Sequence, residues 1–233
     1  MSFTHGRPRH GQIGAGNGLA ASEGPASWIS LAAWVGIAGP VLFTAMYMIQ
    51  EAFRTDEYSP IAEPVSALEA GPYGWVQQVN FVVFGLLTIA FAVGLHRRVQ
   101  QTTAGILGPA LLFISGIGLL LAAIFPLRED ATGATYDPGG HVVAGLTFFL
   151  SSALGLIVLS RRLAHDPSWR SIAMYTLVAG AVALAGFILM GRFVMPDRAP
   201  LHDFAGLAQR MLILFVVFPC RIVLSFRLLR LSK

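Results

Sequence analysis

The sequence predicts an all-α polytopic membrane protein, a bundle of six transmembrane helices. Hydrophobic residues make up 55% of the 233 residues and charged residues only 12%, about half the charged fraction that is usual in soluble domains. The apolar residues come in long blocks, each near the roughly 20 residues that a helix needs to cross a bilayer. Basic residues cluster in short segments between these blocks, as membrane topology requires. The net charge of +4 therefore reflects topology, and nucleic acid is not an expected partner.

Two regions are expected along the chain. The glycine-rich segment 1–27 is predicted to be a disordered cytoplasmic arm, and 28–230 a six-helix transmembrane domain. The predicted spans cover residues 28–49, 75–95, 104–127, 142–160, 172–190 and 204–226. Strands are not expected, because the apolar runs are continuous and too long for strands.

The first five spans carry no charge, whereas the last contains Arg210 and Arg221. Arg221 lies near the cytoplasmic end of that span and is expected to snorkel toward water. Pro40, Pro109 and Pro219 lie within spans and are expected to kink them.

The loops predict the orientation of the bundle. Arginines precede the first span, and pairs of arginines follow the second and fourth spans. These segments lie on one side if the chain crosses six times, and positive charge favours the cytoplasmic side. We therefore expect a multi-pass protein of the cell (inner) membrane with both termini in the cytoplasm.

A short repeat suggests a further level of organisation. The segments "HVVAGL" (141–146) and "HDFAGL" (202–207) share the pattern His-x-x-Ala-Gly-Leu at the heads of two spans. The chain divides on this basis into three helical hairpins that could be repeats. Chance is the competing explanation, because alanine, glycine and leucine recur in membrane helices.

Polar residues collect at the predicted outer face and suggest an outward-facing pocket. Arg210 lies about two turns inside the last span, where an unpaired arginine is costly, so we expect it to face the bundle interior. Its partner is expected to be Asp203, a carboxylate of another hairpin, or a lipid phosphate or carboxylate. The residues predicted to bind a ligand are Glu63, Ser66, Asp130, Asp137, His141, His202, Asp203 and Arg210.

A metal site is an alternative use of the same residues. His141, His202 and Asp130 offer the imidazole and carboxylate ligands that suit zinc. Metal-bound water could then attack an ester or amide of a lipid headgroup, with Glu63 as base and Ser66 orienting the substrate. No local spacing such as His-x-x-x-His supports this hypothesis.

The same residues also have a purely structural interpretation. Asp137 before Pro138 is typical of a helix N-cap followed by proline at the first helical position. Histidines at a membrane boundary need no ligand. Cys220 is the only cysteine and is expected to be a small packing residue.

Five segments taken together resemble a known family. They are "EYSPIAEPVSAL", "GWVQQVNFVVFGL", "SGIGLLLAAIFPLRED", "GGHVVAGL" and "GLAQR", and the likeness covers roughly residues 30–230. In this order they resemble a bacterial six-span group, the Domain of Unknown Function 998 family. The resemblance implies a membrane fold and brings no activity or catalytic residues with it.

The sequence therefore favours a non-catalytic membrane protein that binds lipid or a partner through an outward-facing polar pocket. The expected partners are membrane lipids, another membrane protein or a second copy of the chain. The alternative is the metal-dependent hydrolase acting at the outer face. A small transporter is the third hypothesis, and it is weakened because the uncharged spans give an ion no polar path through the membrane.

Overall fold

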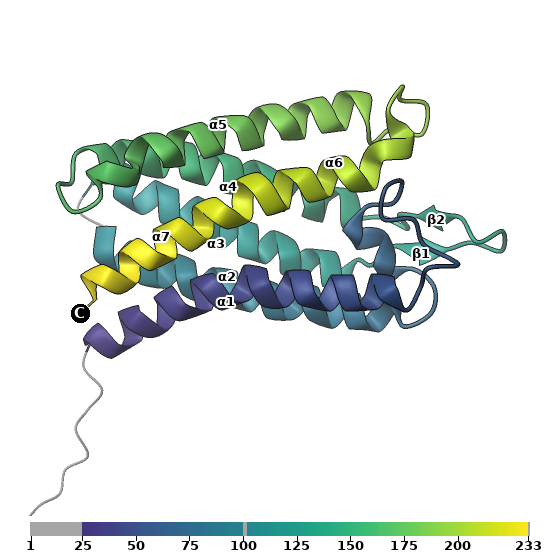
Figure 1. The fold of residues 1–233 in the computed structure, drawn as a ribbon, viewed down its shortest axis with the longest axis horizontal. Helices are drawn as coiled ribbons and strands as arrows, with labels where there is room; N and C mark the ends of the chain where they lie inside the picture. Colours follow the sequence, from purple (N-terminus) through teal and green to yellow (C-terminus); the bar gives the residue numbers. More distant parts are fainter. Residues whose placement is uncertain (1–24, 100–101, 233) are drawn as a thin grey trace, which may run out of the picture.

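In the computed structural model, residues 25–99 and 102–232 are described. They form six helical spans that run along the long axis of the molecule (Figure 1). The first five spans are α1 (Pro25–Ala52), α2 (Gly74–Val99), α3 (Thr103–Ile124), α4 (His141–Ala164) and α5 (Arg170–Phe193). The sixth is α6 (Ala205–Leu212), a π-helical turn (Ile213–Val217) and α7 (Phe218–Leu231). The predicted all-α, six-span fold is confirmed.

The helices are arranged as a ring of neighbours. Each of α1 to α5 packs against the next along the chain, and α7 packs back against α1 and closes the bundle. Small residues allow the closest approaches, because helices in lipid associate by close packing. At Gly118 of α3, a Cβ atom would come within 2.6 Å of the backbone nitrogen of Phe148 in α4. The three-hairpin repeat stays a prediction.

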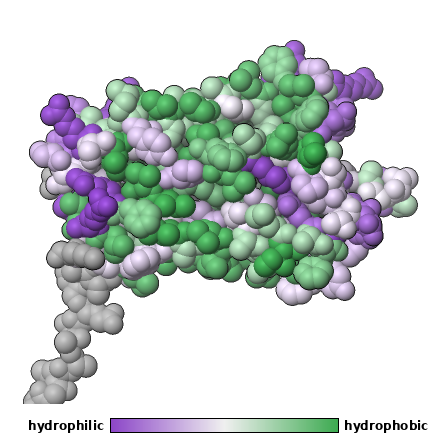
Figure 2. Space-filling model, viewed as in Figure 1, coloured by the Kyte–Doolittle hydropathy of each residue, from purple (hydrophilic) through white to green (hydrophobic). Residues whose placement is uncertain are grey.

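The two ends of the bundle differ in chemistry. One end, called here the hairpin end, holds the connections 53–73, 125–140 and 194–204. These carry a 3-10 helix (Val65–Glu69), the strands β1 (Arg128–Glu129) and β2 (Thr135–Tyr136), and a second 3-10 helix (His202–Phe204). The other end, called the basic end, carries Arg97, Arg98, Arg161, Arg162, Arg170, Arg227 and Arg230. Figure 2 shows an apolar band between two polar ends.

Several boundaries differ from those predicted. The first helix begins at Pro25, so 25–27 belong to it rather than to the arm, and 1–24 lie outside the described residues. The third helix ends at Ile124, short of 127. The β1–β2 hairpin was not expected, because strands of two residues leave no periodic signal in a sequence.

Asp137 caps α4, but from a different position than predicted. The helix begins at His141 after Gly140, whose φ of 104° places the N-cap in the left-handed region that favours glycine. The Asp137 carboxylate accepts hydrogen bonds from the backbone N–H groups of Gly139 (2.8 Å) and Val142 (2.9 Å). The prediction of Asp137 as N-cap with Pro138 in the first turn is therefore wrong, whereas its capping of the exposed amides is confirmed.

The last span is irregular around Pro219. This residue lies in the first turn of α7, directly after the π-helical turn Ile213–Val217. Proline lacks an N–H and its ring clashes with the carbonyl of the preceding turn, so a wider turn relieves the conflict. Arg221 follows and points into the bundle, with only 8% of its surface exposed. The expectation that Arg221 snorkels is wrong, because its guanidinium lies inside the bundle over the rings of Phe84 and Phe91.

Candidate functional site

A cavity of about 450 Å³ occupies the half of the bundle toward the hairpin end. Residues of α1 to α5 and the last span line it, together with the 3-10 helix Val65–Glu69. Its walls are largely aromatic, with the rings of Phe43, Phe81, Phe84, Phe148, Phe149, Phe187 and Phe218. Such a volume falls in the range of roughly 300–1,000 Å³ that is usual for ligand pockets.

Exposed residues of α4 and α5 line one side of the cavity. Gly145 on α4 and Gly191 on α5 both line it, and a Cβ atom at either would meet no other atom within 4 Å. The lining residues Val142 and Leu146 are 63% and 47% exposed. The two helices pack together nearer the basic end, where a Cβ at Gly180 would come within 3.0 Å of the Ala153 carbonyl oxygen. This side of the cavity therefore lies at the apolar flank of the bundle.

Three polar residues line the cavity toward the hairpin end: Ser66, His141 and Gln209. The Gln209 side-chain oxygen accepts a hydrogen bond from the backbone N–H of Val65 at 2.7 Å, which ties α6 to the 3-10 helix. The cavity is therefore amphiphilic, with a long apolar wall and polar groups near the membrane surface.

His141 is held by a buried carboxyl group that the sequence did not single out. Its Nδ1 atom lies 3.0 Å from the carbonyl oxygen of Phe125 and 3.2 Å from Oε2 of Glu69. Because a carbonyl only accepts hydrogen bonds, Nδ1 carries the proton in this contact. The ring is thus fixed in orientation at the polar end of the cavity.

Glu69 is a carboxyl group kept away from water. Its side chain is 0% exposed, and neither of its oxygen atoms has a hydrogen bond of good geometry. Burial raises the pKa of Glu69 to about 8, because the charged form loses its hydration. At neutral pH this group is predominantly protonated.

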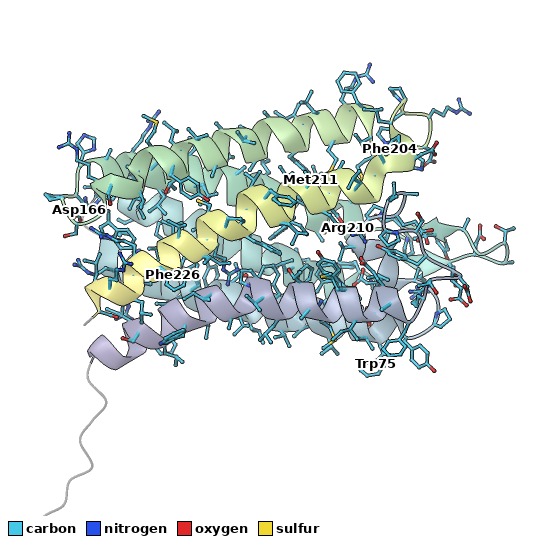
Figure 3. All side chains as sticks on the ribbon, in the orientation of Figure 1. Trp75, Asp166, Phe204, Arg210, Met211 and Phe226 are labelled. Atoms are coloured by element: carbon cyan, nitrogen blue, oxygen red, sulfur yellow. The ribbon has the colours of Figure 1, made fainter. Side chains whose placement is uncertain are left out.

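Arg210 is buried and paired, and its partners belong to the first outer connection. Its Nε donates to Oε1 of Glu51 at 3.2 Å, and Nη2 contacts the same oxygen. Nη2 also donates to the Tyr58 hydroxyl at 2.5 Å, and Nη1 to the carbonyl oxygen of Glu63 at 2.9 Å. The partner is thus a carboxylate of another hairpin rather than Asp203. Figure 3 shows Arg210 where the last span meets the hairpin-end connections.

The structure does not gather the other predicted site residues around this cavity. The exposed Asp130 carboxylate accepts hydrogen bonds from Thr132 and Ala134 in its own turn, and these bonds lower its pKa. His202 contacts the carbonyl oxygen of Val194 at 3.2 Å, and Asp203 is exposed. Glu63 is half-buried, and burial raises its pKa.

No group of three histidine, cysteine, aspartate or glutamate side chains placed to hold a metal occurs within residues 25–99 and 102–232. The predicted zinc ligands His141, His202 and Asp130 each contact other groups instead. Zinc binding stays a prediction, and no contact among these three residues supports it.

Sequence reasoning missed Glu69 and Gln209, and it expected a carboxylate of another hairpin beside Arg210 without identifying Glu51 or Tyr58. One signal was available for Glu69, since Ser66 and Glu69 are three residues apart and a 3-10 helix places such residues on one face. To use this spacing, one would have to know that the connection 53–73 folds into the bundle. The polar composition of that connection does not show that it does.

The fold and the cavity define a polytopic helical membrane protein with an amphiphilic pocket in one half of the bundle. The chain belongs to the family described as protein of unknown function DUF998, whose sequence profile matches residues 37–224. The resemblance seen in the sequence is thereby confirmed. No curated protein and no solved structure matches the chain.

Proposed function

We propose that the protein binds a membrane lipid, with one acyl chain in the cavity and its polar head beside Ser66, His141 and Gln209. The observation that carries this proposal is the open space at Gly145 and Gly191 of the cavity lining, from which we infer an opening toward the apolar flank. A lipid can pass through such an opening without its chain entering water.

The polar residues are expected to select the lipid. A chain that leaves the bilayer for the cavity moves between two apolar surroundings, so it gains packing but no hydrophobic driving force. Discrimination then depends on hydrogen bonds with the head. No lysine or arginine is among the described residues that line the cavity, and this favours the ester and hydroxyl groups of a lipid over its phosphate.

Filling the cavity tests lipid binding. A Cβ atom at Gly145 or Gly191 would meet open space, so we expect the double variant Gly145→Leu/Gly191→Leu to fold. We expect the lipid that copurifies in mild detergent, measured by mass spectrometry per mole of protein, to fall about tenfold or more, as for a loss of 1.4 kcal/mol in affinity.

The matched control is Ala181→Leu, on an exposed position of α5. It should retain the lipid content of the parent. Equal lipid content in the parent and the filled variant would contradict the proposal.

We further propose that the protein lies in the inner membrane of a bacterium, with the hairpin end outward and the lipid drawn from the outer leaflet. The arginines of the basic end support this orientation. Reporter fusions at Ala131 and at Thr102 should report opposite sides of the membrane, with Thr102 in the cytoplasm. Fusions that report the same side would rule out the orientation.

The metal-dependent hydrolase, the small transporter, and binding to a partner protein or a second copy remain hypotheses from the sequence. Metal analysis of the purified protein is the first test of the hydrolase. A stoichiometric metal that is lost in both His141→Ala and His202→Ala variants would favour the hydrolase over simple lipid binding.

A further inference from the structure

Arg221 is a buried cation whose charge has no ionic partner among residues 25–99 and 102–232. Its Nη1 donates a hydrogen bond to the Thr88 hydroxyl at 2.5 Å. Its Nε and Nη2 atoms are buried and have no hydrogen-bond partner. Within the described part of the chain, no carboxylate forms an ion pair with Arg221.

The nearest groups stabilise the cation without neutralising it. The guanidinium lies over the rings of Phe84 and Phe91, at 4.9 and 5.2 Å from their centroids. Aromatic faces attract a cation, but they carry no net charge. An arginine inside a membrane segment is costly unless it pairs or lines a polar cavity, and such residues mark functional sites.

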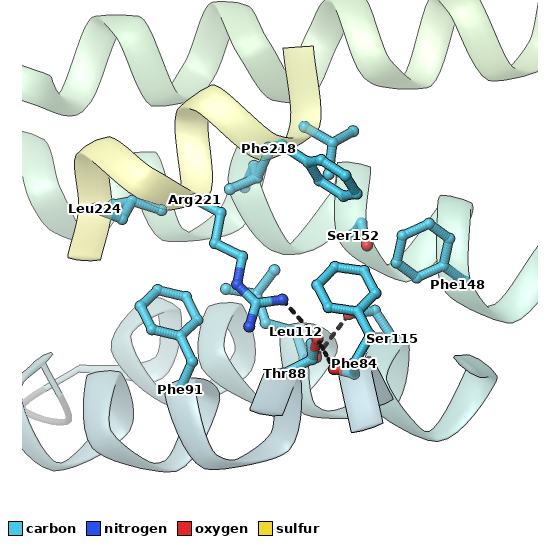
Figure 4. Close-up of a pocket in the computed structure, with 12 residues that line it drawn as sticks. Phe84, Thr88, Phe91, Leu112, Ser115, Phe148, Ser152, Phe218, Arg221 and Leu224 are labelled. Carbon is cyan, nitrogen blue, oxygen red and sulfur yellow. Dashed lines mark hydrogen bonds between the residues drawn. The ribbon is translucent and has the colours of Figure 1, made fainter. Parts of the chain in front are cut away.

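A small cavity lies beside this guanidinium (Figure 4). It measures about 30 Å³ and its walls are mostly aromatic and aliphatic, and the polar residues among those that line it are Arg221, Thr88, Ser115 and Ser152. A cavity needs roughly 10–15 Å³ to hold one water molecule. The space therefore suits one or two water molecules or a single halide ion. A phosphate, or a carboxylate attached to an acyl chain, is too large.

The cavity adjoins the proposed lipid pocket, since the rings of Phe84, Phe148 and Phe218 line both spaces. Arg221, Thr88, Ser115 and Ser152 line only the smaller one. The inference drawn below therefore does not depend on lipid binding.

We propose that Arg221, Thr88 and Ser115, with Ser152, bind one small monovalent anion such as chloride. The anion would supply the negative charge that the protein does not provide. The Thr88 and Ser115 hydroxyls donate to the backbone oxygens of Phe84 and Leu112, each at 2.7 Å. Rotation about the C–O bond would turn either donor toward an anion, because helix carbonyls already accept a backbone hydrogen bond.

Ion exchange at constant ionic strength tests this site. The protein in mild detergent is unfolded thermally while sodium chloride replaces sodium gluconate. A bound anion stabilises the folded state in proportion to its occupancy, so we expect a saturable rise in Tm of about 3 °C or more. Bromide should act like chloride, whereas sulfate, which is too large, should act like gluconate.

Equilibrium dialysis with radioactive chloride gives a direct measurement on the unmodified protein, with one ion expected per chain. Binding should be lost in Arg221→Met and weakened about tenfold in Thr88→Val. The matched control Arg230→Met, on an exposed position of the same helix, should bind like the parent. Chloride that neither binds nor stabilises the parent, or that acts equally on Arg221→Met, would overturn the proposal and leave water as the occupant.

Discussion

Arg210 and Arg221 belong to the same span, both are buried, and their surroundings are opposite in kind. Arg210 faces a carboxylate, a hydroxyl and a carbonyl contributed by the hairpin-end connection. Arg221 lies among aromatic rings and has one hydroxyl as its hydrogen-bond partner. The difference shows that a buried arginine alone does not define a role. Arg210 joins the last span to the first connection, whereas Arg221 retains an unbalanced charge.

The largest expected difference in unfolding free energy is between the variants Arg210→Met and Arg221→Met, compared in chloride-free medium. Arg210→Met leaves the Glu51 carboxylate without its counter-charge and should destabilise the fold by about 3–5 kcal/mol, as for other broken buried pairs. Arg221→Met leaves no carboxylate behind and should cost less than about 2 kcal/mol, the range of one hydrogen bond to a charged group. Denaturant titration in detergent, followed by tryptophan fluorescence, measures both.

Arg210→Lys serves as the companion variant. It keeps the charge but not the planar set of donors, so it should restore only part of the stability. If Arg210→Met and Arg221→Met lose the same unfolding free energy, the contact with Glu51 does not make Arg210 more important for stability than Arg221.

Glu69 extends the comparison to a buried carboxyl group without a cation. Its pKa rises from 4.5 to about 8 on folding, so the folded state binds the proton more tightly than the unfolded state. This contribution to stability is complete below pH 4.5 and is lost as the pH rises toward 8, by an amount on the order of a few kcal/mol.

Glu69→Gln should therefore flatten the fall in stability between pH 5 and pH 8, because an amide does not titrate. Unfolding measured at several pH values, for parent and variant together, gives the difference. Parallel pH profiles would show that Glu69 is charged in the folded protein at neutral pH, and that His141 balances it.

A smaller effect is expected from Thr88→Val, which removes the hydroxyl acceptor of Arg221 and nearly keeps the side-chain volume. Leaving a buried charged donor unsatisfied should cost about 1–3 kcal/mol. The loss should exceed that of Arg221→Met, because removing the partner of a charge is worse than removing the charge itself. The same titration measures both losses. A smaller loss for Thr88→Val than for Arg221→Met would mean that the aromatic rings stabilise the Arg221 cation without the hydroxyl.

The smallest effect is expected at the ion pair between Arg54 and Glu57, where the atoms are 3.8 Å apart and Glu57 is 54% exposed. Water screens this pair, so Glu57→Gln should change the unfolding free energy by no more than about 1 kcal/mol. If Glu57→Gln lost as much unfolding free energy as Arg210→Met, exposure to water would not explain which ion pairs stabilise the fold.

The sequence alone determined the membrane class, the number of spans and most of their extents. These properties follow from the apolar length of each segment and from the charge between segments, and both are local quantities. The interior position of Arg210 also followed from its local context, since a charge two turns inside a span must find a partner. Capping by Asp137 was likewise visible in the few residues around it.

Only the tertiary structure decided which residues meet. Glu51 reaches Arg210, and Glu69 reaches His141, because connections distant in the chain fold onto the same end of the bundle. Arg221 points into the bundle after a π-helical turn, and a single turn of this kind leaves no periodic signal in a sequence. Contacts of this kind depend on distances between segments, and the order of residues along one chain does not contain those distances.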